Sequence, residues 1–297
     1  MQDSFLSGIP WQRFKEFISP RANRLTVLKQ LLEEAGLDYS LLEIAGNRHF
    51  VISPQPPEEG YLRRPPVILV AHYDRAEDSP GANDNSAGVF LLIETAVKLR
   101  TGNVKNWIII FSDKEELNPG ESILNQGAYT LAEGFKTLHM ENPKIFCFDA
   151  CGTGDTLIVS STLEQLLKRE KGGEKLLASI IELRKLALDT ARNLGMVKVL
   201  LAPTPFSDDV GFFRAGLAAQ TITMLPSREC IQLVSELRKS SNFADALINI
   251  EQRQNRQLVK SIPETWRYLN SPGDSYLRLT PRNFRTVVRF AEELCKA

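Results

Sequence analysis

One histidine and five acidic residues stand where short apolar segments of the chain give way to polar ones. They are His72, Asp74, Asp84, Glu115, Glu116 and Asp149. His72 ends the apolar run VILVAH, and Asp149 lies in KIFCFDA. A carboxylate beside a buried strand is costly unless it is paired or binds a metal. One divalent cation would account for the whole group, and a histidine with carboxylates suits zinc.

Each residue also has a simpler explanation when it is taken alone. Asp84 lies in PGANDNSAG at the start of a predicted helix, where it could serve only as a cap. The pair Glu115 and Glu116 could be solvated loop charge, and a lone histidine is more often structural than a ligand. Independent surface charge does not explain why all six gather at the ends of predicted strands, so we expect a metal site.

The predicted elements bring these residues to one edge of a sheet. Apolar runs at 67–72, 107–112 and 144–150 indicate strands buried on both faces. A helix is predicted at 85–99, because Phe90, Ile93 and Val97 keep helical spacing. Strand, loop and helix alternate from 67 to 150, which is typical of a mainly parallel sheet covered by helices. Functional groups in such sheets gather where strands end in loops.

The rest of the chain continues this pattern. Strands are predicted around a turn at 41–53 and at 157–160, 197–201 and 219–225, a surface loop at 53–66, and helices at 23–36, 174–193 and 281–295. Residues 227–266 are polar and helical in pattern, and we interpret them as an insertion or lid. We expect one domain over 1–297.

Composition excludes several classes of function. The 36 basic residues balance the 36 acidic ones, whereas nucleic-acid and membrane-surface proteins carry a basic excess. No apolar run reaches the roughly 20 residues of a membrane span, and the N-terminus has no signal pattern. We therefore expect a cytoplasmic protein. The four cysteines form no CxxC pair and are expected to be reduced.

Four segments together resemble the zinc aminopeptidases related to bacterial leucyl aminopeptidase and glutaminyl cyclase. AHYDRAEDSPGANDNSAGV resembles that family's AHxD…PGAxDNxxG signature, and FSDKEELNPGES resembles its strand followed by a glutamate pair. FDACG and SDDVGFFRAGL resemble its third-carboxylate and SDHxxFxxxGIP segments. The resemblance runs from about residue 20 to the C-terminus. It implies a three-layer α/β fold, with a twisted, mainly parallel mixed sheet between helices.

The resemblance also implies roles for the six residues. His72 and Asp149 would bind one zinc, Asp84 would bridge two, and Glu116 would bind the second. Glu115 would be the general base for a metal-activated water. Asp74 would orient His72 through its other ring nitrogen.

Two positions depart from the family pattern. NSPGDS at 270–275 stands where the family has HTPxDT, so Asn270 replaces the last histidine ligand, and Asp209 in SDD replaces the histidine of SDH. The other histidines, His49 and His139, are no evident substitutes. An amide oxygen binds zinc poorly. We therefore expect one zinc and a weak or absent second, with Asn270 and Asp209 as candidate metal or substrate contacts.

Three functions stay open on these grounds. The first is a metal-dependent exopeptidase that removes N-terminal residues from short peptides. The second is a glutaminyl cyclase-like acyltransferase, which in this family also relies on the missing histidine. The third is a catalytically impaired relative that binds a peptide or protein. Metal number, side-chain preference and oligomeric state are left open by the sequence.

Overall fold

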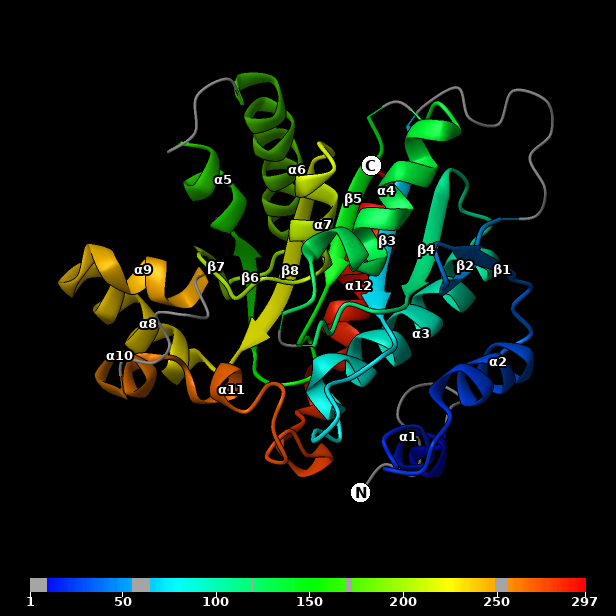
Figure 1. The fold of residues 1–297 in the computed structure, drawn as a ribbon, viewed down its shortest axis with the longest axis horizontal. Coiled ribbons are helices and arrows are strands. Elements are labelled where there is room, and N and C mark those ends of the chain that lie inside the picture. Colours follow the sequence, from blue (N-terminus) through cyan, green and yellow to red (C-terminus); the bar gives the residue numbers. More distant parts are fainter. Residues whose placement is uncertain (1–9, 55–64, 119, 141, 169–172, 249–255) are drawn as a thin grey trace.

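The computed structural model describes residues 10–54, 65–118, 120–140, 142–168, 173–248 and 256–297. Within these residues the centre of the fold is an eight-stranded mixed sheet in the order β1-β2-β4-β3-β5-β8-β6-β7 (Figure 1). The strands are β1 Ser40–Ile44, β2 Asn47–Ile52, β3 Val67–His72, β4 Trp107–Ser112, β5 Lys144–Phe148, β6 Thr156–Ser160, β7 Val199–Ala202 and β8 Ala219–Leu225.

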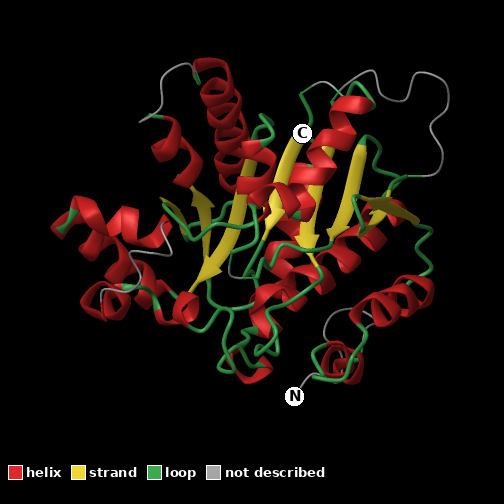
Figure 2. Ribbon diagram, in the orientation of Figure 1, coloured by secondary structure: helices red, strands yellow, loops and turns green. Residues whose placement is uncertain are grey.

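The predicted fold class is confirmed. The central strands β4, β3, β5 and β8 run parallel, and β6 pairs parallel with β7. The pairs β1–β2, β2–β4 and β6–β8 are antiparallel, which makes the sheet mixed. Figure 2 shows the strands between helical layers.

Helices cover both faces of the sheet (Figure 1). Alternate residues of β3 point to opposite sides: Leu69 joins the apolar cluster that includes α3 and α12, whereas Val70 joins the cluster that includes α4 and α7. This alternation explains why β3 reads as a continuous apolar run. The helices are α1 Trp11–Phe17, α2 Arg24–Glu34, α3 Ala87–Thr101, α4 Gly127–Thr137, α5 Thr162–Leu167, α6 Glu174–Asn193, α7 Asp208–Arg214 and α12 Phe284–Leu294.

The predicted segments agree with these elements except near their ends. The helix expected from residue 85 begins at Ala87, because Asp84 and Asn85 have non-helical backbone angles. The strand expected at 197–201 is Val199–Ala202. The loop predicted at 53–66 lies mostly outside the described residues. No helix in the described part of the chain is long and apolar enough to cross a membrane.

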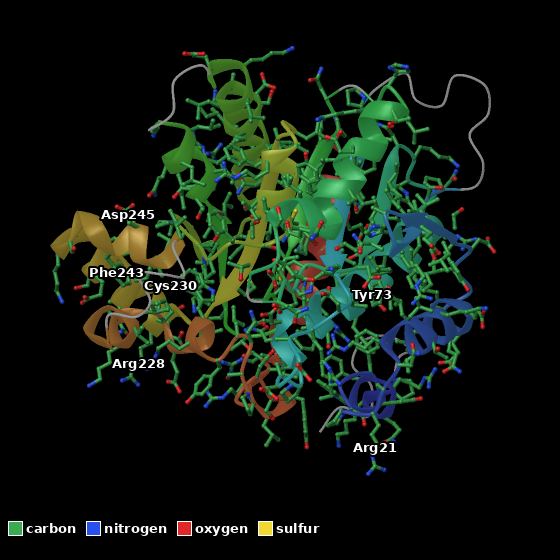
Figure 3. The ribbon with its side chains drawn as sticks, viewed as in Figure 1. Arg21, Tyr73, Arg228, Cys230, Phe243 and Asp245 are labelled. Atoms are coloured by element: carbon green, nitrogen blue, oxygen red, sulfur yellow. The ribbon has the colours of Figure 1, made fainter. Side chains whose placement is uncertain are left out.

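The segment interpreted as an insertion or lid contains α8 Ser227–Lys239, α9 Ser241–Ile248, α10 Arg256–Ser261 and α11 Glu264–Arg267. These helices gather beside β6 and β7 (Figure 1). Phe243 and Cys230, labelled in Figure 3, belong to an apolar cluster that joins the segment to Ile158 of β6 and Leu225 of β8. The segment is therefore packed on the sheet; a role as a lid stays a prediction.

Candidate metal centre

Three of the predicted ligands lie together at the carboxyl edge of the sheet, two of them because their strands pair in parallel. His72 ends β3, and Asp149 directly follows β5, its parallel neighbour. Asp84 arrives from the turn that leads into α3. His72 Nε2 lies 3.1 Å from Asp84 Oδ1 and 3.7 Å from Asp149 Oδ1. One ligand atom from each residue lies within 4.8 Å of the other two.

These donor atoms fit a zinc ion. His72 is fully buried, and neither its Nε2 nor Asp149 Oδ1 has a hydrogen-bond partner among the described residues. Buried polar atoms without partners are costly, and a cation between them would remove that cost. One imidazole nitrogen and two carboxylates form a common protein set for zinc, with a position left for water or substrate.

Asp74 contacts the opposite nitrogen of the same imidazole. Its Oδ1 lies 3.3 Å from His72 Nδ1. Its carboxylate also accepts hydrogen bonds from the backbone amides of Glu115 (3.2 Å) and Glu116 (3.0 Å). Burial raises the pKa of Asp74, but the contacts with His72 and the two amides outweigh it and lower the pKa. Asp74 is thus an ionised carboxylate that connects the histidine to the glutamate pair.

Glu115 and Glu116 line a cavity of about 250 Å³ together with Asp84 and Asp149. Burial raises the pKa of Glu115 well above its ordinary value, and the charge of Glu116 adds to the effect. Burial and the charge of Asp84 raise the pKa of Glu116 to about 9. Gln126, the residue before α4, orients this carboxyl, because its Nε2 donates to Glu115 Oε1 at 3.3 Å.

Burial of His72 lowers its pKa, but contacts with Asp149, Asp74 and Asp84 prevail and raise it well above 6.5. Burial and the charge of Asp149 raise the pKa of Asp84. A cation bound between these groups would compete with their protons.

Asp274 supports the turn that carries Asp84. Its carboxylate accepts hydrogen bonds from the backbone amides of Asn83 (2.9 Å) and Asp84 (3.0 Å). From the same turn, Asn85 Nδ2 donates to the carbonyl of Phe148, the last residue of β5, at 2.7 Å. The peptide bond between Asp84 and Asn85 is cis. Our sequence reasoning missed Asp274, although the aspartate shared by NSPGDS and HTPxDT was a signal for it.

The two substituted positions lie in different places. Asn270 is exposed, has φ of 58°, and lines the same cavity as Asp84 and Glu116. Asp209 is fully buried at the start of α7 and is not among the residues that line the cavity. Its Oδ1 accepts a hydrogen bond from the amide of Ser207 at 3.2 Å. Its neighbour Asp208 accepts a hydrogen bond from Ser112 Oγ at 2.6 Å.

The two remaining histidines lie away from the ligand group. His49 is buried in β2, where its Nδ1 accepts a hydrogen bond from the amide of Asp113 at 3.2 Å. Burial lowers the pKa of His49 to about 4, so it is neutral at pH 7. His139 is exposed between α4 and β5. Neither histidine joins the group formed by His72, Asp84 and Asp149.

The lining of the cavity also includes apolar side chains. Ile248, Trp266 and Leu269 come from the C-terminal helical region, and Phe206 and Val210 come from the loop and helix before β8. The helical segment therefore contributes directly to the wall of the cavity. A charged floor with an apolar wall is the usual composition of a small-molecule or peptide-end site.

Comparison with solved structures finds the same fold in zinc peptidases. A zinc aminopeptidase from Bacillus subtilis is 18% identical, with a TM-score of 0.53 over 84% of this chain and 48% of that chain. A leucine aminopeptidase precursor from Bacteroides thetaiotaomicron is 15% identical, with a TM-score of 0.62 over 96% and 95%. Glutaminyl cyclase of the same organism, bound to N-acetylhistamine, is 15% identical, with a TM-score of 0.62 over 96% of each chain.

At these identities the likeness concerns the fold alone, and the chain spans about half the length of the Bacillus subtilis enzyme. A comparison with curated protein sequences gives no match. The sequence profile of peptidase family M28, in contrast, matches residues 51–292. That match contains His72, Asp84 and Asp149 and every strand from β3 to β8. The chain is therefore a member of peptidase family M28.

Proposed function

We propose that the protein is a zinc-dependent aminopeptidase that releases N-terminal residues from peptides. The observation that carries this proposal is the convergence of His72, Asp84 and Asp149 beside a cavity that Glu115 also lines. Membership of a peptidase family and the fold shared with zinc aminopeptidases support the same activity.

His72, Asp84 and Asp149 would hold the first zinc. Asp84 and Glu116 are the strong donors available for a second, weaker one. Bound zinc supplies Lewis acidity, which polarises a carbonyl and makes water a nucleophile near neutral pH. Asp74 keeps the His72 ring in place and thereby fixes the direction of Nε2 toward the ligand group.

Glu115 is the residue that moves the proton. Its carboxyl lines the cavity and is oriented by Gln126. As a carboxylate it can accept a proton from the attacking water and then donate that proton to the amine that leaves. The same carboxyl therefore serves both halves of the hydrolysis.

The cavity suits the free end of a peptide. Its carboxylates would attract the positively charged α-amino group, and its apolar wall would contact the first side chain. The described residues that line the cavity include neither lysine nor arginine to pair with a C-terminal carboxylate. This charge distribution favours an aminopeptidase over a carboxypeptidase.

The test measures zinc per chain and the release of amino acids from peptides with varied N-terminal residues. Glu115→Gln is expected to retain zinc and to lose hydrolysis by about 10²–10⁴-fold. Glu77→Gln, at an exposed position of the loop after β3, is the control and should behave like the parent. Zinc-loaded parent protein that hydrolyses no peptide of the panel would sink the proposal.

One observation favours a second candidate, a peptide-binding protein without catalysis. Asn270, at the place of the family's last histidine, is an exposed amide, so the second metal position keeps only two strong donors. Saturable binding of peptides without release of amino acids would identify this function. Cyclisation of N-terminal glutamine in the same panel would instead identify a cyclase.

A further inference from the structure

We propose that Arg24 is a positioning residue of the metal centre, because it ties together the two ends of the loop between β3 and α3. One end of this loop follows His72, and the other carries Asp84. Arg24 opens α2 and lies outside the residues that match the family profile, 51–292. No motif in the sequence singles it out. The link to zinc rests on the proposed function, whereas the link between the two ends of the loop does not.

The guanidinium of Arg24 donates five hydrogen bonds, all to residues between β3 and α3. The acceptors are Tyr73 O (3.0 Å), Asp74 O (2.9 Å), Pro80 O (2.9 Å), Gly81 O (3.2 Å) and Ser86 Oγ (2.8 Å). Tyr73 and Asp74 directly follow His72, and Gly81 and Ser86 flank Asp84. Figure 3 labels Tyr73 at this end of β3. One side chain thus bonds to both ends of the loop between β3 and α3.

An arginine suits this arrangement. Its terminal nitrogens Nη1 and Nη2 make all five contacts and carry four N–H donors in a planar fork, whereas a lysine ammonium has three donors on one atom. The guanidinium stacks on Phe17 at 4.7 Å, which fixes its plane. A Cβ at position 81 would stand 2.8 Å from Arg24 Nη2, so the glycine there allows the close approach.

Arg24 is buried together with the partners that it binds. It is only 7% exposed, although arginine is seldom buried without partners. Four of its acceptors are backbone carbonyls of the loop between β3 and α3. Removing the guanidinium would take a hydrogen bond from each of these carbonyls and remove the link between the two ends of the loop. The distance between His72 and Asp84 would then no longer be held by this link.

Arg75 offers a matched control. Its guanidinium donates to the carbonyls of Ile18 (2.9 Å), Ser19 (3.1 Å) and Pro20 (3.1 Å), which lie between α1 and α2. Arg75 therefore attaches the N-terminal helices to the same region, with one marginal contact to Pro80 at 3.5 Å. Loss of Arg75 should loosen that attachment without separating the two ends of the loop that Arg24 joins.

The experiment compares the parent with Arg24→Gln, Arg24→Lys and Arg75→Gln by two measurements. The first is hydrogen exchange of the amides of Ala82, Asn83, Asp84 and Ser86 in the metal-free protein. The second is zinc affinity by competition with a chelator.

In Arg24→Gln, we expect hydrogen exchange at these amides to accelerate at least tenfold relative to amides of β3. We expect zinc affinity to fall about 10–100-fold, as for other residues behind a metal ligand. Arg75→Gln should stay within about threefold of the parent in both.

A folded Arg24→Gln protein that matches Arg75→Gln in both measurements would overturn the proposal. Arg24→Lys decides the matter if the glutamine variant does not fold, since it keeps the charge but has too few donors for both ends of the loop. Parent-like exchange and zinc affinity in Arg24→Lys would also overturn the proposal. If the parent binds no zinc, the function proposed above fails, and the exchange measurement still decides whether Arg24 holds the two ends of the loop together.

Discussion

Asp209→Asn should stabilise the metal-free protein at pH 8. Asp209 is fully buried, and burial raises its pKa to about 7, with the charges of Asp149 and Asp208 adding to the effect. The amide of asparagine has nearly the same shape. Its oxygen can still accept the hydrogen bond from Ser207, which Asp209 Oδ1 accepts at 3.2 Å. The Thr221 hydroxyl, whose contact with the carboxyl lowers its pKa, can accept a hydrogen bond from the amide nitrogen instead. The substitution therefore removes a buried charge and can keep both contacts.

The size of the effect follows from the two pKa values. The carboxyl titrates near 7 in the folded chain and near 3.8 when unfolded, a difference of about 3 pH units. At 1.36 kcal/mol for each unit, ionisation of Asp209 costs the native state up to about 4 kcal/mol above pH 7. Because the folded pKa is the higher one, this cost decreases as the pH falls from 7 toward 3.8. It is absent below that value.

The assay is urea unfolding in EDTA at pH 8 and pH 5, with parent, Asp209→Asn and the exposed control Asp78→Asn. We expect Asp209→Asn to gain about 2–4 kcal/mol at pH 8 and about half of that at pH 5. Asp78→Asn should stay within about 0.5 kcal/mol of the parent at both pH values. An Asp209→Asn protein that is no more stable than the parent at pH 8, or whose gain does not depend on pH, would refute the reasoning.

Three further predictions concern the site and the fold. Asp74→Asn removes the ionised partner of His72 and should lower zinc affinity about 10–100-fold in chelator competition, whereas unchanged affinity would mean that the contact is incidental. Asn270→His should raise the zinc content from about one to about two ions per chain, measured by mass spectrometry, since position 270 lines the cavity. No increase would mean that a side chain at position 270 does not reach the second metal position. Gly154→Ala should cost about 3 kcal/mol in urea unfolding, because φ is 110° and its Cβ would stand 2.1 Å from a backbone carbon of β8. Gly195→Ala, with positive φ but open space, should cost only about 1 kcal/mol, and equal costs would contradict the steric argument.

The sequence predicted the elements well where local signals are strong. β3 and β4 were found because strands buried on both faces are short, continuous apolar runs. Both ends of the helix predicted at 23–36 also carry local signals. Asn23 caps its first turn by accepting a hydrogen bond from the amide of Thr26, and Gly36 after its last turn has a positive φ. The start of α3 was predicted two residues early, because no residue pattern near Asp84 and Asn85 indicates their non-helical backbone.

The sequence by itself determined which residues were candidates and that two of them, His72 and Asp149, lie at the ends of neighbouring strands. They converge because parallel strands end at the same edge of a sheet, which the alternating pattern already implies. Only the tertiary structure decided what holds Asp84 against them. Arg24 and Asp274 come from α2 and from the loop before α12, far from Asp84 in sequence, and bond mainly to backbone atoms. Backbone carbonyls and amides are the same at every residue, so the side chains around Asp84 do not identify these partners. The motif NSPGDS offered a signal for Asp274 but not for what it binds, and both contacts are fixed only when packing brings the segments together.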